Sequence, residues 1–168
     1  GDGNDTISFS GDETVILSDF TNLSNVETLT AASSIYIKGN LGSLAASAGI
    51  STVTFNDDGD DDNLVIDAEF TSTLTVNLDD GDNTLNASAY TGTITAAIAE
   101  AIADAAADTH TITGGTGSGD IILVTADGTG IDNADMTTLT KFEKLTIANN
   151  ASTGTIVLDE LNIDDGKT

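Results

Sequence analysis

Short runs of alternating threonine and aliphatic residues return along the middle of the chain at nearly regular intervals. Strict alternation predicts β-strands with different side chains on their two faces, and a period of about 20 residues is typical of one coil of a β-solenoid. We expect the aliphatic residues, Val53, Leu74, Ile94 and Ile112, to point inward and the threonines to point outward. The runs are TVTF at Thr52, TLTV at Thr73, TITA at Thr93 and TITG at Thr111, so the sequence numbers of successive starts differ by 21, 20 and 18.

The rest of the chain has the same strand-rich character. Further runs rich in Thr, Ile, Val and Leu are separated by Gly, Asp, Asn and Ser, which favour turns. The predicted strands cover 6–10, 14–17, 27–31, 34–38, 52–55, 63–67, 73–78, 84–87, 93–96, 111–113, 121–125, 144–148 and 155–158.

Two small-residue segments depart from this pattern. Residues 96–108 have apolar and acidic residues at helical spacing, so they could form either a short helix or a strand of small residues. The small-residue segment LGSLAASAG, residues 41–49, has the same two alternatives. The fold class that we predict is therefore all-β, a parallel β-solenoid with short irregular or helical insertions.

Acidic or glycine-rich turns follow the strands at matching places. They are NDDGDDDN at 56–63, DDGDN at 79–83 and GGTGSGD at 114–120. If the coils stack, the first two turns lie one above the other about 4.8 Å apart, and their aspartates form a ladder of like charges. Either a cation offsets the repulsion, or the turns are only solvated loops.

Composition narrows the choice of ligand. The chain has 28 acidic and four basic side chains, a net charge of −24, no cysteine and one histidine, His110. Calcium takes six to eight oxygen ligands, which such turns supply, whereas zinc and copper favour cysteine and histidine. The charge argues against nucleic acid and anionic membranes as partners, and no apolar run is long enough for membrane insertion. With no thiol and no arginine, we expect no enzymatic activity.

A longer repeat is also present. DFTNLSNVETLT, residues 19–30, aligns on DMTTLTKFEKLT, residues 135–146, at an offset of 116, with six of twelve positions identical. Gly3 and Asp5 correspond to Gly117 and Asp120 if one residue is inserted. We expect residues 1–168 to be a single solenoid fragment of a tandem array, with one unit at about 1–113 and a partial unit at about 114–168.

The motifs in this repeat resemble those of a known group of proteins. GDGNDTI at the N-terminus is similar to the tail of the G-G-x-G-x-D-x-U-x nonapeptide of RTX proteins, and GGTGSGDII at 114–122 resembles it with one extra residue. LSNVETLT and LTKFEKLT resemble segments of bacterial surface-layer proteins and large secreted adhesins. The resemblance implies calcium bound between coils and folding after export. By position, it assigns the motif to Gly1, Gly3 and Asp5, and to Gly114, Gly115, Gly117 and Asp120.

These observations predict a calcium-stabilised structural module of a secreted bacterial surface protein, located outside the cell and assembling with copies of itself in a surface layer or filament. The alternative is an adhesin module that binds a cell-surface polysaccharide, or ice through the outward Thr-x-Thr pairs. Uneven strand spacing argues against ice, and few aromatic residues argue against sugar. The candidate Ca²⁺ ligands are Asp2, Asp5, Asp57, Asp58, Asp60, Asp62, Asp79, Asp80, Asp82 and Asp120.

Overall fold

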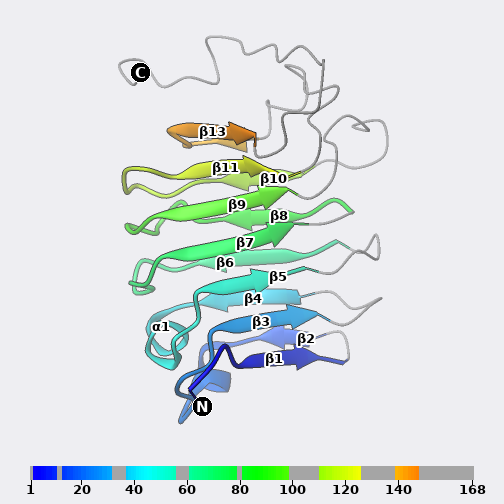
Figure 1. Cartoon of the computed structure of the whole chain (residues 1–168), viewed down its shortest axis with the longest axis vertical. Helices are drawn as coiled ribbons and strands as arrows, with labels where there is room; N and C mark the ends of the chain where they lie inside the picture. Colours follow the sequence, from blue (N-terminus) through cyan, green and yellow to red (C-terminus); the bar gives the residue numbers. More distant parts are fainter. Residues whose placement is uncertain are drawn as a thin grey trace.

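The chain winds between two parallel sheets, so that each coil adds one strand to each sheet (Figure 1). The computed structural model describes residues 2–10, 13–31, 37–55, 61–78, 81–98, 110–125 and 139–147. The odd sheet contains β1 (Thr6–Phe9), β3 (Thr28–Ala31), β5 (Thr52–Thr54), β7 (Leu74–Leu78), β9 (Ile94–Ile98), β11 (Ile121–Val124) and β13 (Lys144–Ile147). The even sheet contains β2 (Glu13–Val15), β4 (Ile37–Leu41), β6 (Asn63–Ile66), β8 (Thr84–Asn86), β10 (Thr111–Thr113) and β12 (Leu139–Thr140). The predicted fold class, a parallel β-solenoid, is confirmed.

The coils are longer than the threonine runs predicted. Residues in register along the odd sheet are Thr6, Thr28, Thr52, Thr75, Thr95, Ile121 and Lys144, whose sequence numbers differ by 22, 24, 23, 20, 26 and 23. The prediction was wrong because the run at Thr111 belongs to the even sheet, where Thr111 pairs with Thr84. In addition, Thr52 pairs with Thr75 rather than Thr73, a shift of two positions that leaves each side chain on its face.

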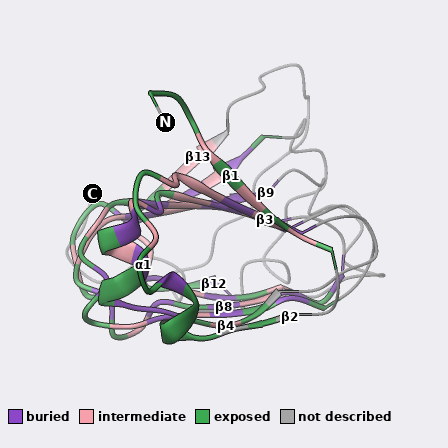
Figure 2. Ribbon diagram, turned by 90° about the horizontal axis from the view of Figure 1, so that it is seen from below, coloured by how far each residue is buried: buried purple, intermediate pink, exposed green. Residues whose placement is uncertain are grey.

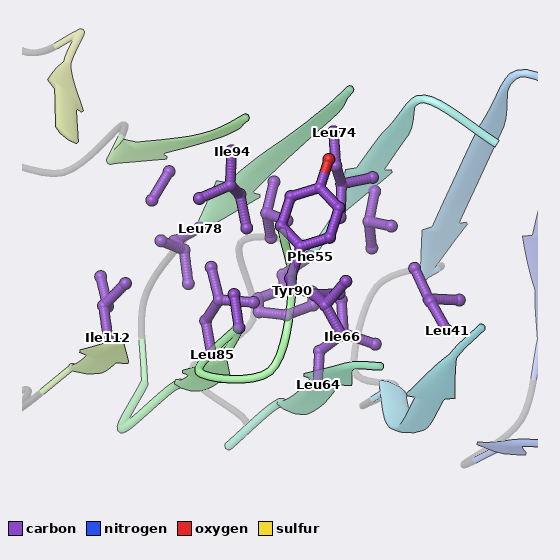
Figure 3. Packing of buried hydrophobic residues seen from close by; sticks show 14 of the residues in the cluster. Leu41, Phe55, Leu64, Ile66, Leu74, Leu78, Leu85, Tyr90, Ile94 and Ile112 are labelled. Carbon is purple, nitrogen blue, oxygen red and sulfur yellow. The ribbon is translucent and has the colours of Figure 1, made fainter. Parts of the chain in front are cut away.

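The core lies between the facing sheets. Val53, Leu74, Ile94 and Ile112 are all fully buried, as predicted. In Figure 3, Leu74 and Ile94 of the odd sheet face the side chains that the even sheet contributes. Buried residues occur in the strands of both sheets, as the view along the stack shows (Figure 2), and they alternate with more exposed residues in strands such as β6 and β7. Each fully buried leucine or isoleucine contributes roughly 1.5–3 kcal/mol, so these aliphatic side chains stabilise the central coils most.

The predicted insertions have different outcomes. Residues 41–49 contain the helix α1 (Ser43–Ala48), which ends at Gly49 with a φ of 106° and packs against the 3₁₀ turn η1 (Leu17–Phe20). The first part of 96–108 is a strand, since β9 extends to Ile98, and residues 99–109 lie outside the described residues. β4 covers Ile37–Leu41, and residues 34–36 of the strand predicted there lie outside the described residues. β12 was not predicted, and the strand expected at 155–158 also lies outside the described residues.

Candidate functional site

A column of polar residues stands where the chain enters the even sheet. Because Asn63, Thr84 and Thr111 are in register, the residues before them, Asp62, Asn83 and His110, follow one another along the stack. The Asp62 N–H donates to Asn83 Oδ1 at 2.9 Å. The N–H group of Thr84 donates to the carbonyl of Asp62, and that of Thr111 donates to the carbonyl of Asn83, both at 2.8 Å. Asp62 is 1% exposed and Asn83 is fully buried, so this column is part of the hydrogen-bonded wall of the solenoid.

An exposed pair of aspartates lies beside this column. The N–H of Asp82 donates to Asp61 Oδ1 at 3.0 Å, across one coil. The described parts of the first two acidic turns therefore stack, as predicted. Asp61 was not selected from the sequence, although its place before Asp62 in a stacked turn could have indicated it. The candidate ligands Asp57, Asp58, Asp60, Asp79 and Asp80 lie outside the described residues.

The glycine turn at 114–120 does not belong to this ladder. It follows β10 of the even sheet and leads into β11 of the odd sheet, whereas the two acidic turns lead from odd strands into even strands. It therefore lies at the opposite edge of the solenoid. The expectation of matching places was wrong for this turn because the Thr-Ile-Thr pattern is the same in both sheets.

Asp120 holds the glycine turn against two neighbouring coils. Its carboxylate is fully buried and accepts the N–H of Ile94 at 2.9 Å and the N–H of Gly115 at 2.7 Å. Its own N–H donates to Glu143 Oε2 at 2.8 Å, and its carbonyl accepts the N–H groups of Glu143 and Lys144. One residue thus connects β9, its own turn and β13.

Tyr90 packs beside this turn. Its hydroxyl lies against the carbonyls of Ser72 and Thr93, and its ring meets Phe70 edge-on, with the ring centroids 5.9 Å apart. Burial raises the pKa of Tyr90 to about 12, and the charge of Asp120 adds to the effect. A Cβ at Gly115 would stand 2.7 Å from the Tyr90 carbonyl oxygen and 3.2 Å from Asp120 Oδ2. The turn therefore needs glycine there for close packing between coils.

The same arrangement occurs at the start of the chain. The Asp5 N–H donates to Glu27 Oε2 at 2.8 Å, and the Asp5 carbonyl accepts the N–H groups of Glu27 and Thr28, both at 3.1 Å. Glu27 and Glu143 are related by the offset of the long repeat, and each binds the residue that precedes an odd strand. Neither glutamate was selected from the sequence, but their identity in that repeat was a usable signal.

The candidate ligands are not gathered into one centre. Asp5 and Asp120 stand at one edge, before β1 and β11, while Asp62 and Asp82 stand at the other. Asp2 is exposed and Asp5 is half-buried. Within the described ranges, no group of three or more His, Cys, Asp and Glu side chains is placed to hold a metal ion.

A second candidate surface is the outer face of the odd sheet. Five threonines are in register along it, namely Thr6, Thr28, Thr52, Thr75 and Thr95. A second column two positions further on consists of Ser8, Thr30, Thr54, Asn77 and Ala97. Nine of these ten positions are exposed or half-buried and Ala97 is buried, and none of the ten carries a charge in a chain of net charge −24. The corresponding column of the even sheet is mixed, with Thr14, Lys38, Asn63, Thr84 and Thr111.

This face corrects the predicted threonine array. Thr73 and Thr93 precede their strands, Thr111 and Thr113 lie on the other sheet, and Thr6 and Thr28 extend the column that was expected. The uneven spacing of the runs does not disturb the column, because the turns absorb the differences in coil length.

Fold and surfaces together define a parallel β-solenoid with polar turn columns on its edges and a threonine face on one sheet. Comparison of the chain with protein-family models, with curated proteins and with solved structures found no match. Among the described residues, no helix is long and apolar enough to span a membrane.

Proposed function

We propose that the chain is a calcium-stabilised, non-catalytic structural module of a secreted bacterial surface protein that assembles with copies of itself. The observation that carries this proposal is the stacking of the acidic turns, with Asp61 of one coil bonded to the backbone of Asp82 in the next. Two unit charges about 4 Å apart repel by roughly 1 kcal/mol in water and by more near a protein surface. A divalent cation offsets this cost, and carboxylates with turn carbonyls are its preferred ligands.

Location follows from the same chemistry. A cation that binds the folded chain and not the unfolded chain stabilises the fold by mass action. Repulsion among 28 acidic groups then keeps the chain unfolded where calcium is scarce and lets it fold where calcium is plentiful. This behaviour suits a protein that folds outside the bacterial cell, as the resemblance to RTX and surface-layer proteins implies.

The test is a calcium titration of chelator-treated protein, followed by circular dichroism and a parallel sizing measurement. We expect strand signal and compaction or assembly with calcium and not with magnesium at equal ionic strength. No response to calcium, or an equal response to both ions, would contradict the proposal.

A matched pair of double variants locates the effect. Asp61→Asn with Asp82→Asn removes two charges from the stacked turns and preserves hydrogen-bonding side chains. Asp67→Asn with Glu69→Gln removes two charges from the opposite edge. We expect the first variant to need about tenfold more calcium for the same signal, a change of about 1.4 kcal/mol, and the second to behave as the unaltered protein.

The threonine face favours a second candidate function, binding of ice. Neighbouring strands are about 4.8 Å apart and alternate residues of a parallel strand are about 6.6 Å apart, so the column of five threonines presents regularly spaced hydroxyl and methyl groups, with the side chains of Ser8, Thr30, Thr54 and Asn77 beside it. The uncharged outward positions from β1 to β9 support an ordered-water ligand over an ionic one. For polysaccharide, the support is weaker, because Phe20, Phe55, Phe70 and Tyr90 are buried and Phe9 and Phe142 are partly buried.

Ice binding is tested by measuring inhibition of ice recrystallisation. Thr75→Lys places a charge at the middle of the threonine face, and Thr84→Lys places the same charge at a comparably half-buried position of the even sheet. We expect activity to be lost in the first variant and kept in the second. An inactive unaltered protein, or equal loss in both variants, would remove this candidate.

A further inference from the structure

We infer that tandem copies of the long repeat form one uninterrupted solenoid, in which the outer edge of β1 pairs with a strand equivalent to β9 from the copy that precedes it. The inference concerns a surface and its partner, and it goes beyond the calcium proposal. It rests on the equivalence of β1 with β11 and not on any ion.

The equivalence holds at the level of register. β1 pairs with β3 through Thr6 and Thr28, and β11 pairs with β13 through Ile121 and Lys144. The sequence numbers of the first members of these pairs differ by 115 and those of the second members by 116, because the second copy has one more residue between its two strands, in addition to the one inserted in its glycine turn. The Glu27 bond to Asp5 and the Glu143 bond to Asp120 are the same contact in two places.

The backbone of the connecting loop repeats as well. Asn25 has a φ of 56° and Lys141 has a φ of 60°. A positive φ is unusual for a residue other than glycine, above all for lysine, so its recurrence at the offset of the long repeat identifies the same local structure. The chain therefore returns to its starting arrangement after the five odd strands β1, β3, β5, β7 and β9.

Because the arrangement of strands repeats, the strand that pairs with the outer edge of β1 can be identified. Among the described strands, β1 is the terminal strand of the odd sheet, whereas its equivalent β11 lies between β13 and β9. The missing neighbour of β1 is by equivalence a β9-like strand, and a preceding copy of the unit supplies it. An edge of unpaired backbone groups is a template for such pairing.

The sequence at such a junction fits. If Gly114 of one copy is followed directly by Gly1 of the next, then Gly1, Gly3 and Asp5 occupy the places of Gly115, Gly117 and Asp120. The joined sequence reads GGDGNDTI, in which the spacing of the glycines and the aspartate lacks the one extra residue of the 114–120 turn.

Gly3 and Gly117 show what the preceding coil contributes. A Cβ at Gly117 would collide with the carbonyl oxygen of Gly92 and would stand 2.7 Å from that of Thr91. A Cβ at Gly3 would have nothing within 4 Å. Gly3 is therefore replaceable in the present chain, and it becomes irreplaceable once a preceding copy packs against it.

The experiment uses the full chain and a fused chain in which residues 1–114 are placed directly ahead of Gly1. We expect the fused chain to unfold in one transition and to be longer in solution scattering by about 24 Å, which is five strand spacings of about 4.8 Å. We expect Gly3→Ala at the junction to lower its unfolding midpoint by about 4 °C or more, and to shift the midpoint of the unfused chain by less than about 1 °C.

A fused chain with a flexible Gly-Ser spacer of about ten residues at the junction is the control for two separate bodies. Two unfolding transitions in the directly fused chain, or scattering that matches the spacer variant, would overturn the inference. So would equal effects of Gly3→Ala in the fused and unfused chains. All comparisons are made in saturating calcium and repeated in chelator, so a failure to respond to calcium is recorded separately from a failure to join.

Discussion

The carboxylate of Asp120 accepts the backbone N–H of Ile94 at 2.9 Å, although the two residues belong to neighbouring coils. The aspartate of a glycine-aspartate turn thus acts as a brace between coils, with both carboxylate oxygens bound to backbone N–H groups. This hydrogen bonding is a structural role of Asp120 that is separate from its proposed part in calcium binding.

Replacement of Asp120 by alanine should be costly. The change leaves the N–H groups of Ile94 and Gly115 buried without their acceptor, at roughly 1–3 kcal/mol each, so we expect a loss of about 3 kcal/mol in the free energy of unfolding. Urea denaturation of the calcium-saturated protein measures it. Asp2→Ala at an exposed position is the control, and a loss as large there would contradict the specific role of Asp120.

Gly117 should not tolerate a side chain. Its Cβ would meet the carbonyl oxygens of Gly92 and Thr91, so we expect Gly117→Ala to destabilise the protein by about 2 kcal/mol or more. Thermal unfolding measures the change. Gly3→Ala, at the equivalent place without a preceding coil, should be close to neutral, and similar losses at both glycines would show that backbone freedom rather than packing matters there.

The raised pKa of Tyr90 predicts that the folded protein loses stability in strong alkali. The pKa of its phenol is about 10 in the unfolded chain and about 12 in the folded one, so the folded state holds the proton more tightly. The resulting stabilisation is complete below pH 10 and declines as the pH rises toward 12. Urea unfolding across this range, with tyrosinate absorbance recorded in parallel, tests it.

The control for this prediction is Tyr90→Phe. It removes the hydroxyl from the carbonyls of Ser72 and Thr93 and should cost about 1–2 kcal/mol at neutral pH. The decline specific to Tyr90 between pH 10 and 12 should then disappear. If the variant keeps the full decline, the alkaline sensitivity has another origin.

Replacement of Lys141 should stabilise the folded protein. It adopts a φ of 60°, a conformation that asparagine and glycine tolerate better than lysine, and the equivalent residue in the first unit is Asn25. We expect Lys141→Asn to stabilise the protein by about 0.5–1 kcal/mol in urea denaturation. Lys141→Ala removes the same charge without the conformational benefit and should not stabilise. An equal gain from alanine would assign the effect to charge.

Alternation alone was enough to identify the inward residues. Val53 and Ile94 are buried because a period of two places them on the inner face in either sheet. The same pattern could not say which sheet a strand joins, and so Thr111 was stacked on Thr93 when it pairs with Thr84. Coil length depends on the turns, which carry no periodic signal.

The candidate site was predictable only where it depended on stacking. The two consecutive acidic turns predicted that aspartates of neighbouring coils lie one above the other. This is the contact between Asp61 and Asp82, although Asp61 itself was not selected. The burial of Asp120 and its bonds to Ile94 and Gly115 could not be derived from the sequence, since they depend on how a glycine turn folds back over the coil before it. Glu27 and Glu143 were visible only as identities in a repeat.

The order of strands in the two sheets also has a mechanical consequence. Consecutive odd strands are always neighbours, and so are consecutive even strands, with the first and last coils at opposite ends of the stack (Figure 1). Tension applied to the two chain termini therefore acts on the outermost coil, and the next coil bears the load only after that coil has detached. The molecule should lengthen in steps that each release the chain of a single coil, and the steps should differ in size as the coil lengths along the odd sheet do. Such a rod dissipates a pull gradually instead of failing at once.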